Sequence, residues 1–164
     1  MENAKPNRLY LTVVLLTMLI LPVLSAGITW YYDKALSNIN PSNALRGLAV
    51  VWLVFWGVGI RLVVAGLRQI LKPAFTAETI FSLKTTESHV VIRELGFANL
   101  TLGLMAIASL FFETWRLPAA CMGIFFYGVA GIQHVIKRPA SPNEWIALVS
   151  DLYISIVLLV CLVA

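Results

Sequence analysis

The chain has little charge for its length. Only 12% of its 164 residues are Asp, Glu, Lys or Arg, against about 25% in an average soluble domain. This scarcity excludes intrinsic disorder and a coiled coil, because both require far more charge. Apolar residues make up 60% of the chain and the mean hydropathy is +0.87, more apolar side chain than a soluble core of this size could bury. The composition predicts an all-α integral membrane protein whose main partner is the lipid bilayer.

Cysteine and histidine are also scarce, with two of each. Cys121 and Cys161 both lie in apolar stretches, so we interpret them as small core residues rather than a disulfide or a metal pair. His134 lies in an apolar segment and His89 in a polar connection, which argues against a bis-histidine haem. CxxC, HExxH, GxSxG and phosphate-loop motifs are absent. We therefore predict no catalytic residue, no metal and no cofactor, and we favour a non-enzymatic protein.

Five apolar runs are long enough to cross a hydrocarbon core, which takes about 20 helical residues. They predict a single transmembrane domain over residues 1–164, with spans at about 9–30, 47–71, 93–112, 117–136 and 145–164. Pro22 predicts a kink in the first span. The connection 73–91 mixes apolar and charged residues, which indicates a short interfacial helix or, from Glu87 onward, an early start of the third helix.

The basic residues indicate the orientation of the bundle. There are 12 Lys and Arg against eight Asp and Glu, and they lie mostly between the apolar runs, which favours a role in membrane topology over nucleic-acid binding. With the N-terminus in the cytoplasm, nine fall on the inner side: Lys5, Arg8, Arg61, Arg68, Lys72, Lys84, Arg93, Lys137 and Arg138. Only Lys34, Arg46 and Arg116 fall outside. We therefore expect a multi-pass cell (inner) membrane protein with the C-terminus outside.

Polar residues of separate spans fall at a similar depth near the inner side. Arg61, Asn99 and Asp151 each lie roughly 8–9 Å below the inner boundary, at about 1.5 Å per helical residue. Glu94 and His134 lie closer to the interface. Because intramembrane charges are costly, they normally face the bundle interior and pair, so we expect Arg61 to pair with Asp151.

Each of these residues has an alternative role. Arg61 could bind an anion or reach the interface with its long side chain. Asp151 could be a structural partner of Arg61 or His134, or a proton or substrate site. We interpret Asn99 as an interhelical hydrogen-bonding residue and His134 as a hydrogen-bonded rather than metal-bound histidine. Glu94 could pair with neighbouring cations at the headgroups.

Small residues mark the helix faces expected to pack. Gly96, Gly103 and Ala106 lie on one stripe of the third span, together with Asn99, and Gly123 and Gly131 lie on the fourth. Such stripes are typical of places where helix backbones approach closely in a membrane.

The segment Arg93-Glu94-Leu95-Gly96-Phe97-Ala98-Asn99-Leu100, followed by Gly103, resembles the DUF6790 family of small membrane proteins of unknown function. More loosely, the chain is similar to DoxX-like four-helix membrane proteins. Glu94, Gly96 to Asn99, Gly103, Gly131, His134 and Asp151 match the family pattern over about Leu53 to Ala164, which leaves the first helix outside. The resemblance implies a DoxX-like core of the last four helices and supplies no activity. This chain has Arg68-Gln69 where family members often carry Gly-His, so a two-histidine site is not carried over.

These observations lead to one hypothesis and two alternatives. We expect a small polar pocket near the cytoplasmic side that binds or passes a small molecule or a proton, lined by Arg61, Glu94, Asn99, His134 and Asp151. One alternative is a membrane redox or lipid-modifying enzyme subunit. The other is a structural accessory subunit of a membrane complex, or a homo-oligomer.

Overall fold

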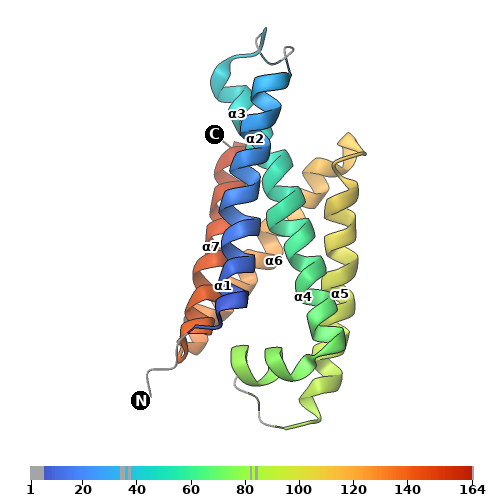
Figure 1. The fold of residues 1–164 in the computed structure, drawn as a ribbon, viewed down its shortest axis with the longest axis vertical. Coiled ribbons are helices and arrows are strands. Elements are labelled where there is room, and N and C mark those ends of the chain that lie inside the picture. The colour runs from blue at the N-terminus through green and yellow to red at the C-terminus, as the bar shows by residue number, and fades with distance from the viewer. Residues whose placement is uncertain (1–5, 34–35, 37, 82, 84, 164) are drawn as a thin grey trace.

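The computed structural model describes residues 6–33, 36, 38–81, 83 and 85–163. In this part of the chain five continuous helical segments are long and apolar enough to cross a membrane. They run over Arg8–Tyr32, Pro41–Leu71, Ser88–Ala108, Glu113–Lys137 and Pro142–Val163, and successive segments run up and down the bundle (Figure 1). The all-α class with five span-length helices is therefore confirmed. Lys5, Lys34 and Lys84, which contribute to the predicted orientation, lie outside the described residues.

The first segment consists of α1 (Arg8–Leu15), a π-helical turn (Leu16–Ile20) and α2 (Leu21–Tyr32). The Asn7 side chain caps α1 by accepting a hydrogen bond from the backbone N–H of Tyr10 at 3.0 Å. The π-helical turn ends just before Pro22, at the first turn of α2. Because proline has no N–H to donate, it interrupts the regular hydrogen-bond ladder at the position where the sequence predicted a kink.

The second segment consists of α3 (Pro41–Trp52), a π-helical stretch (Leu53–Ile60) and α4 (Arg61–Leu71). Asn40 accepts from the backbone N–H of Ser42 and Pro41 occupies the first turn, which fixes the start of α3 six residues before the predicted boundary. The π-helical stretch was not predicted. It ends directly before Arg61, and such irregular turns inside helices are frequent at functional sites.

The remaining spans are α5 (Ser88–Ala108), α6 (Arg116–Lys137) and α7 (Pro142–Val163), with a 3₁₀ turn at Glu113–Trp115 before α6. Helix α5 starts five residues before the predicted span, in line with the alternative that the third helix begins near Glu87. Within the connection 73–91 the structure contains a short π-helical segment, Phe75–Ile80. It lies across the end of the bundle that also carries the α6–α7 connection (Figure 1).

Two tightly packed helix pairs, α4 with α5 and α6 with α7, form most of the bundle. The second segment touches α5 backbone to backbone at two glycine pairs, one in α4 and one in the π-helical stretch Leu53–Ile60. A Cβ at Gly66 would lie 2.7 Å from the carbonyl oxygen of Gly96, and one at Gly103 would lie 2.8 Å from that of Gly59. No larger residue fits at such separations, which explains the small-residue stripe of the third span.

The other predicted packing residues also lie at helix contacts. Ala106 is fully buried in the core. A Cβ at Gly123 would meet the side chain of Val58 at 2.7 Å, and one at Gly131 would meet Leu152 at 2.6 Å. These glycines therefore allow α6 to approach the π-helical stretch and α7.

Two tryptophans tie the first span to the second. Trp52 donates its ring N–H to the Thr29 hydroxyl at 3.0 Å, and Trp56 donates to the Ser25 hydroxyl at 3.0 Å. Each indole thereby has a polar contact, as expected where a Trp N–H would otherwise be buried without an acceptor.

Candidate functional site

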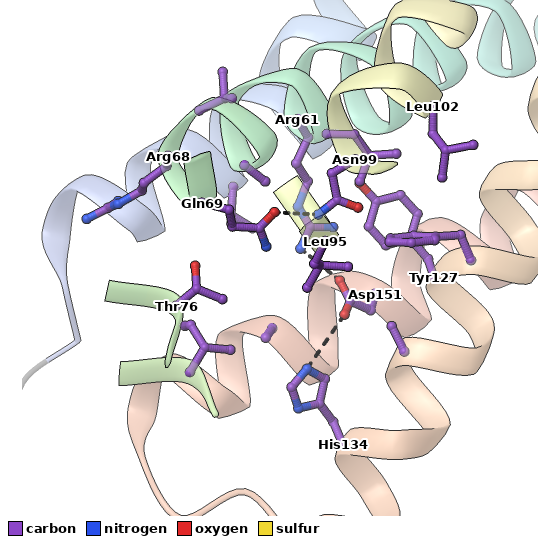
Figure 2. A pocket seen from close by; sticks show the side chains of 18 of the residues that line it. Arg61, Arg68, Gln69, Thr76, Leu95, Asn99, Leu102, Tyr127, His134 and Asp151 are labelled. Atoms are coloured by element: carbon purple, nitrogen blue, oxygen red, sulfur yellow. Dashed lines mark hydrogen bonds and ion pairs between the residues drawn. The ribbon is translucent and has the colours of Figure 1, made fainter. Parts of the chain in front are cut away.

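A cavity of about 810 Å³ lies between the helix pairs α4/α5 and α6/α7. Helix α1 contributes Tyr10 and Val13 to its wall, and the segment Phe75–Ile80 contributes Phe75, Thr76 and Ile80. Its size falls in the range of about 300–1,000 Å³ that is typical of small-molecule sites. The walls are mainly aliphatic and aromatic, with polar side chains from α4, α5, α6 and α7 among them, including Arg61, Gln69, Asn99, His134 and Asp151 (Figure 2).

The centre of the polar group is an ion pair between α4 and α7. The Arg61 Nη2 atom lies 2.8 Å from Asp151 Oδ1, and the two residues are only 8% and 6% exposed. The predicted pairing is therefore observed, and Arg61 does not extend to the interface. A charge at the bilayer centre costs about 2.5–3.5 kcal/mol on insertion scales, so each member of the pair offsets part of the cost of the other.

Arg61 has further partners that satisfy its guanidinium. Nη2 also donates to the Ser150 hydroxyl at 2.7 Å, and Nη1 lies 3.6 Å from the Met18 sulfur. The guanidinium carbon lies 4.8 Å from the centre of the Tyr127 ring. An arginine ordered by a carboxylate, a hydroxyl and an aromatic face is held in one position.

Tyr127 is in turn fixed by the irregular helix before Arg61. Its hydroxyl donates to the carbonyl oxygen of Gly57 at 3.2 Å. Gly57 belongs to the π-helical stretch Leu53–Ile60. The unusual turn therefore contributes directly to the site, because it presents a backbone acceptor to the ring that covers Arg61.

His134 approaches the second oxygen of the aspartate. Its Nε2 atom lies 3.9 Å from Asp151 Oδ2, which is too long for a hydrogen bond. Asp151 thus directs Oδ1 to Arg61 and Oδ2 toward His134 (Figure 2). The imidazole is 8% exposed and lines the cavity.

Asn99 forms the predicted interhelical hydrogen bond. Its Nδ2 donates to Gln69 Oε1 at 2.7 Å, which links α5 to α4. Its Oδ1 is buried and has no hydrogen-bond partner among the residues that the structure describes. It points away from Gln69, toward the Tyr127 side of the cavity (Figure 2). A buried acceptor without a donor costs about 1–3 kcal/mol.

Glu94 is not part of this group, which corrects the expectation that it lines the pocket. It is exposed and absent from the cavity wall. At about 100° per residue, Glu94 lies about 140° around the helix from Asn99. The neighbouring Leu95 occupies the cavity face instead.

Several lining residues were missed or underrated. Arg68 is seven residues after Arg61, which places both on one face of α4, and this spacing could have indicated Arg68. Tyr127 shares a face with His134 in the sequence pattern, but its contact with Arg61 was not foreseen. Nothing in the sequence around Gln69 or Tyr10 indicated that they line a cavity, because their roles depend on residues far away in the chain.

The segment Phe75–Ile80 and Phe81 are held against the helices at one end of the cavity. The Arg68 guanidinium carbon lies 3.5 Å from the centre of the Phe75 ring, and the Tyr10 ring centre lies 6.2 Å from it. On the opposite side Lys137 Nζ donates to the carbonyl oxygen of Phe81 at 2.7 Å and lies 3.5 Å from Glu144 Oε1. These contacts attach the segment to α1, α4 and α6.

The cavity also reaches the flank of the bundle between α5 and α6. Phe125 and Val129 of α6 line it although they are 72% and 66% exposed. Leu95 and Leu102 of α5 line the facing wall. In a bilayer this flank would face acyl chains. Within residues 6–33, 36, 38–81, 83 and 85–163, no three His, Cys, Asp or Glu side chains come close enough to hold a metal.

The fold and site together define a bundle of five span-length helices with a buried arginine–aspartate pair beside an apolar cavity. Residues 12–164 match the family DUF6790, which is described as a family of unknown function, and the chain belongs to this family. The match includes most of the first span, so the expectation that the resemblance begins near Leu53 is wrong. No curated protein and no solved structure matches the chain. The looser likeness to DoxX-like proteins stays a prediction.

Proposed function

We propose that the chain is an integral membrane protein that binds a small molecule in the cavity, on the cytoplasmic side of the bilayer. The cavity itself carries the proposal. It is large enough for a ligand, and its walls are mainly apolar with polar side chains from α4, α5, α6 and α7 among them. An ion pair retained solely for structure would not need an adjoining space of about 810 Å³.

The proposed orientation rests on the basic residues. Arg61 is buried in the bundle, so it does not count among the charges that set topology. Without it, eight basic residues remain on the side of the N-terminus and three on the other. This excess supports a cytoplasmic N-terminus and places the Phe75–Ile80 segment and the cavity toward the cytoplasm.

Binding is favoured over passage across the membrane because the outer half of the bundle is tightly packed. Val54, Val58 and Leu158 are at most 1% exposed and lie on the outer side of Arg61 and Asp151. A molecule entering from the inner end or the flank would meet this apolar core and stop beside the ion pair.

The test is ligand occupancy in a variant whose cavity is filled. Ala130 of α6 lines the cavity, so Ala130→Trp should occupy the space that a ligand uses. Val135 of the same helix is exposed and lies outside the cavity, so Val135→Trp is the matched control. Native mass spectrometry of protein extracted in its own lipids should show bound small molecules for the parent chain and the control, and their loss for Ala130→Trp. Equal occupancy in all three would contradict the proposal.

The same preparations separate the alternatives. A visible absorption band from a co-purified flavin or haem would favour a redox subunit. A mass that always includes a second copy or another protein, with no small molecule, would favour a structural subunit.

A further inference from the structure

Asn99 lines the cavity, and its Oδ1 is a buried acceptor that lacks a partner within the described residues. Asn99 is 4% exposed, and its other amide atom is already engaged with Gln69 Oε1. The oxygen is an acceptor, so the group that completes it must donate a hydrogen bond.

The charges around the cavity restrict that donor further. Arg61, Arg68 and Lys137 line the cavity and Asp151 is the single acidic residue in its wall among those described. A cationic head group would therefore be repelled. An anionic head group would gain at Arg68 and Lys137, but a carboxylate or phosphate dianion has no proton to give to Asn99. An uncharged donor, such as a hydroxyl, satisfies both conditions.

The rest of the ligand is defined by the walls. From Asn99 the cavity continues past Leu102, Phe125 and Val129 to the flank between α5 and α6. These side chains offer no hydrogen bonds, so they suit an apolar tail. An opening on this flank would also let a membrane-dissolved molecule enter sideways from the acyl-chain region.

We infer that the ligand is an uncharged amphiphile of the long-chain alcohol type, with its hydroxyl on Asn99 Oδ1 and its tail along α5 and α6. This inference rests on the proposed function and adds the chemical class of the ligand. The unpaired oxygen is the reason for proposing a ligand with a hydroxyl group rather than a purely apolar molecule.

The probes are three photoreactive long-chain compounds with the same tail: a primary alcohol, its methyl ether and the corresponding carboxylic acid. Each carries a diazirine in the tail and is added to the protein in nanodiscs of neutral lipid. After irradiation, mass spectrometry compares labelling of the cavity-facing peptides of α5 and α6 with labelling of the exposed face around Val135. The alcohol should label the cavity roughly two- to tenfold more than the ether, the factor expected for one neutral hydrogen bond.

The matched variants test the role of the amide. In Asn99→Leu combined with Gln69→Leu, both partners of the interhelical bond are removed together, so no amide is left unpaired. The preference for alcohol over ether should disappear in this variant while ether labelling is kept. Thr101→Val is the control on the same helix, because the Thr101 hydroxyl is exposed and bonds to Phe97 of its own helix. It should keep the preference.

The outcomes separate the two proposals. If ether or acid labels the cavity as strongly as alcohol, or if the double variant keeps the preference, the ligand class is wrong and the binding cavity stands. If none of the three probes labels the cavity above the exposed face, the proposed function itself is contradicted. If the double variant does not fold, the parent chain is labelled with the photoreactive alcohol in the presence of unlabelled alcohol or unlabelled ether. The alcohol should reduce the labelling more than the ether does. Equal reduction by both would contradict the inference.

Discussion

Arg61 and Asp151 are 90 residues apart in the chain, and their side chains meet at 2.8 Å in the interior of the bundle. This contact joins α4 of one helix pair to α7 of the other. The pair therefore holds together the two halves that enclose the cavity.

Breaking this pair on one side should destabilise the protein strongly. Asp151→Asn leaves the Arg61 charge buried without its carboxylate, a change that costs about 3–5 kcal/mol in buried pairs. We expect a clearly lower melting temperature in detergent. The double variant Arg61→Met, Asp151→Leu should recover most of the loss, because it leaves no buried charge.

The control for this prediction is Glu113→Gln. It removes the contact between Glu113 and Arg116 at 2.8 Å, but the glutamate is exposed, so at most about 1 kcal/mol is expected. If Asp151→Asn melts like this control and loses its bound small molecule, the pair serves the ligand rather than stability. If it changes neither, the pair has neither role.

The backbone contact between α4 and α5 leads to a second prediction. Gly66→Ala places a Cβ 2.7 Å from the carbonyl oxygen of Gly96 and 2.7 Å from the backbone nitrogen of Leu100. Backbone atoms move at high cost, so a loss of about 1–3 kcal/mol is expected in thermal or denaturant unfolding. Gly47→Ala, in α3, meets nothing within 4 Å and should be neutral or stabilising by up to about 1 kcal/mol. The same effect in both variants would contradict the contact.

A third prediction concerns the attachment of Phe75–Ile80. Lys137→Met removes the donor to the carbonyl oxygen of Phe81, so the segment should open more often. Hydrogen–deuterium exchange should be faster over residues 75–81. It should also rise at the start of α7, where Lys137 lies 3.5 Å from Glu144 Oε1, and stay unchanged in the middle of α7. Arg93→Met, on the exposed start of α5, is the control and should leave this exchange unchanged. Unaltered exchange in Lys137→Met would show that Arg68 and Tyr10 are sufficient to hold the segment.

A fourth prediction concerns orientation. In a chain with Cys121 and Cys161 replaced by alanine, a single cysteine is introduced at the exposed Thr114 or at the exposed Ala140. A membrane-impermeant maleimide on intact cells should label Thr114→Cys, because the α5–α6 connection is outside in the proposed orientation. Ala140→Cys should react only after permeabilisation. The reverse pattern would place the N-terminus outside.

The depth of the polar residues in the bundle could be predicted from the sequence. The face of the helix on which each of them lies could be predicted only in part. Antiparallel helices with a constant rise place Arg61 and Asp151 at one level, and their mutual attraction then makes contact the favoured arrangement. Glu94 shows the limit of this reasoning, because depth alone does not define the face of a helix. Counting 100° per residue from Asn99 would have excluded it.

Other features depend on packing that a single sequence does not encode locally. The stripe with Gly96 and Gly103 predicted a close helix contact, but its partners Gly66 and Gly59 follow only from the register between the second segment and α5. The π-helical stretch before Arg61 widens the turn of an otherwise regular apolar helix, and its sequence has no feature that separates it from α-helix. The hydrogen bond from Tyr127 to Gly57 could not be foreseen without it.

The glycine pairs also determine how the bundle can move. With backbones in direct contact at Gly59–Gly103 and Gly66–Gly96, the second segment and α5 form one packed unit that carries Arg61 and Asn99 together. Sliding of one against the other would force carbonyl oxygens into neighbouring main chain. Widening of the cavity for a larger molecule would therefore come from movement of α6 and α7 or of Phe75–Ile80, while Arg61 and Asn99 keep their relative positions.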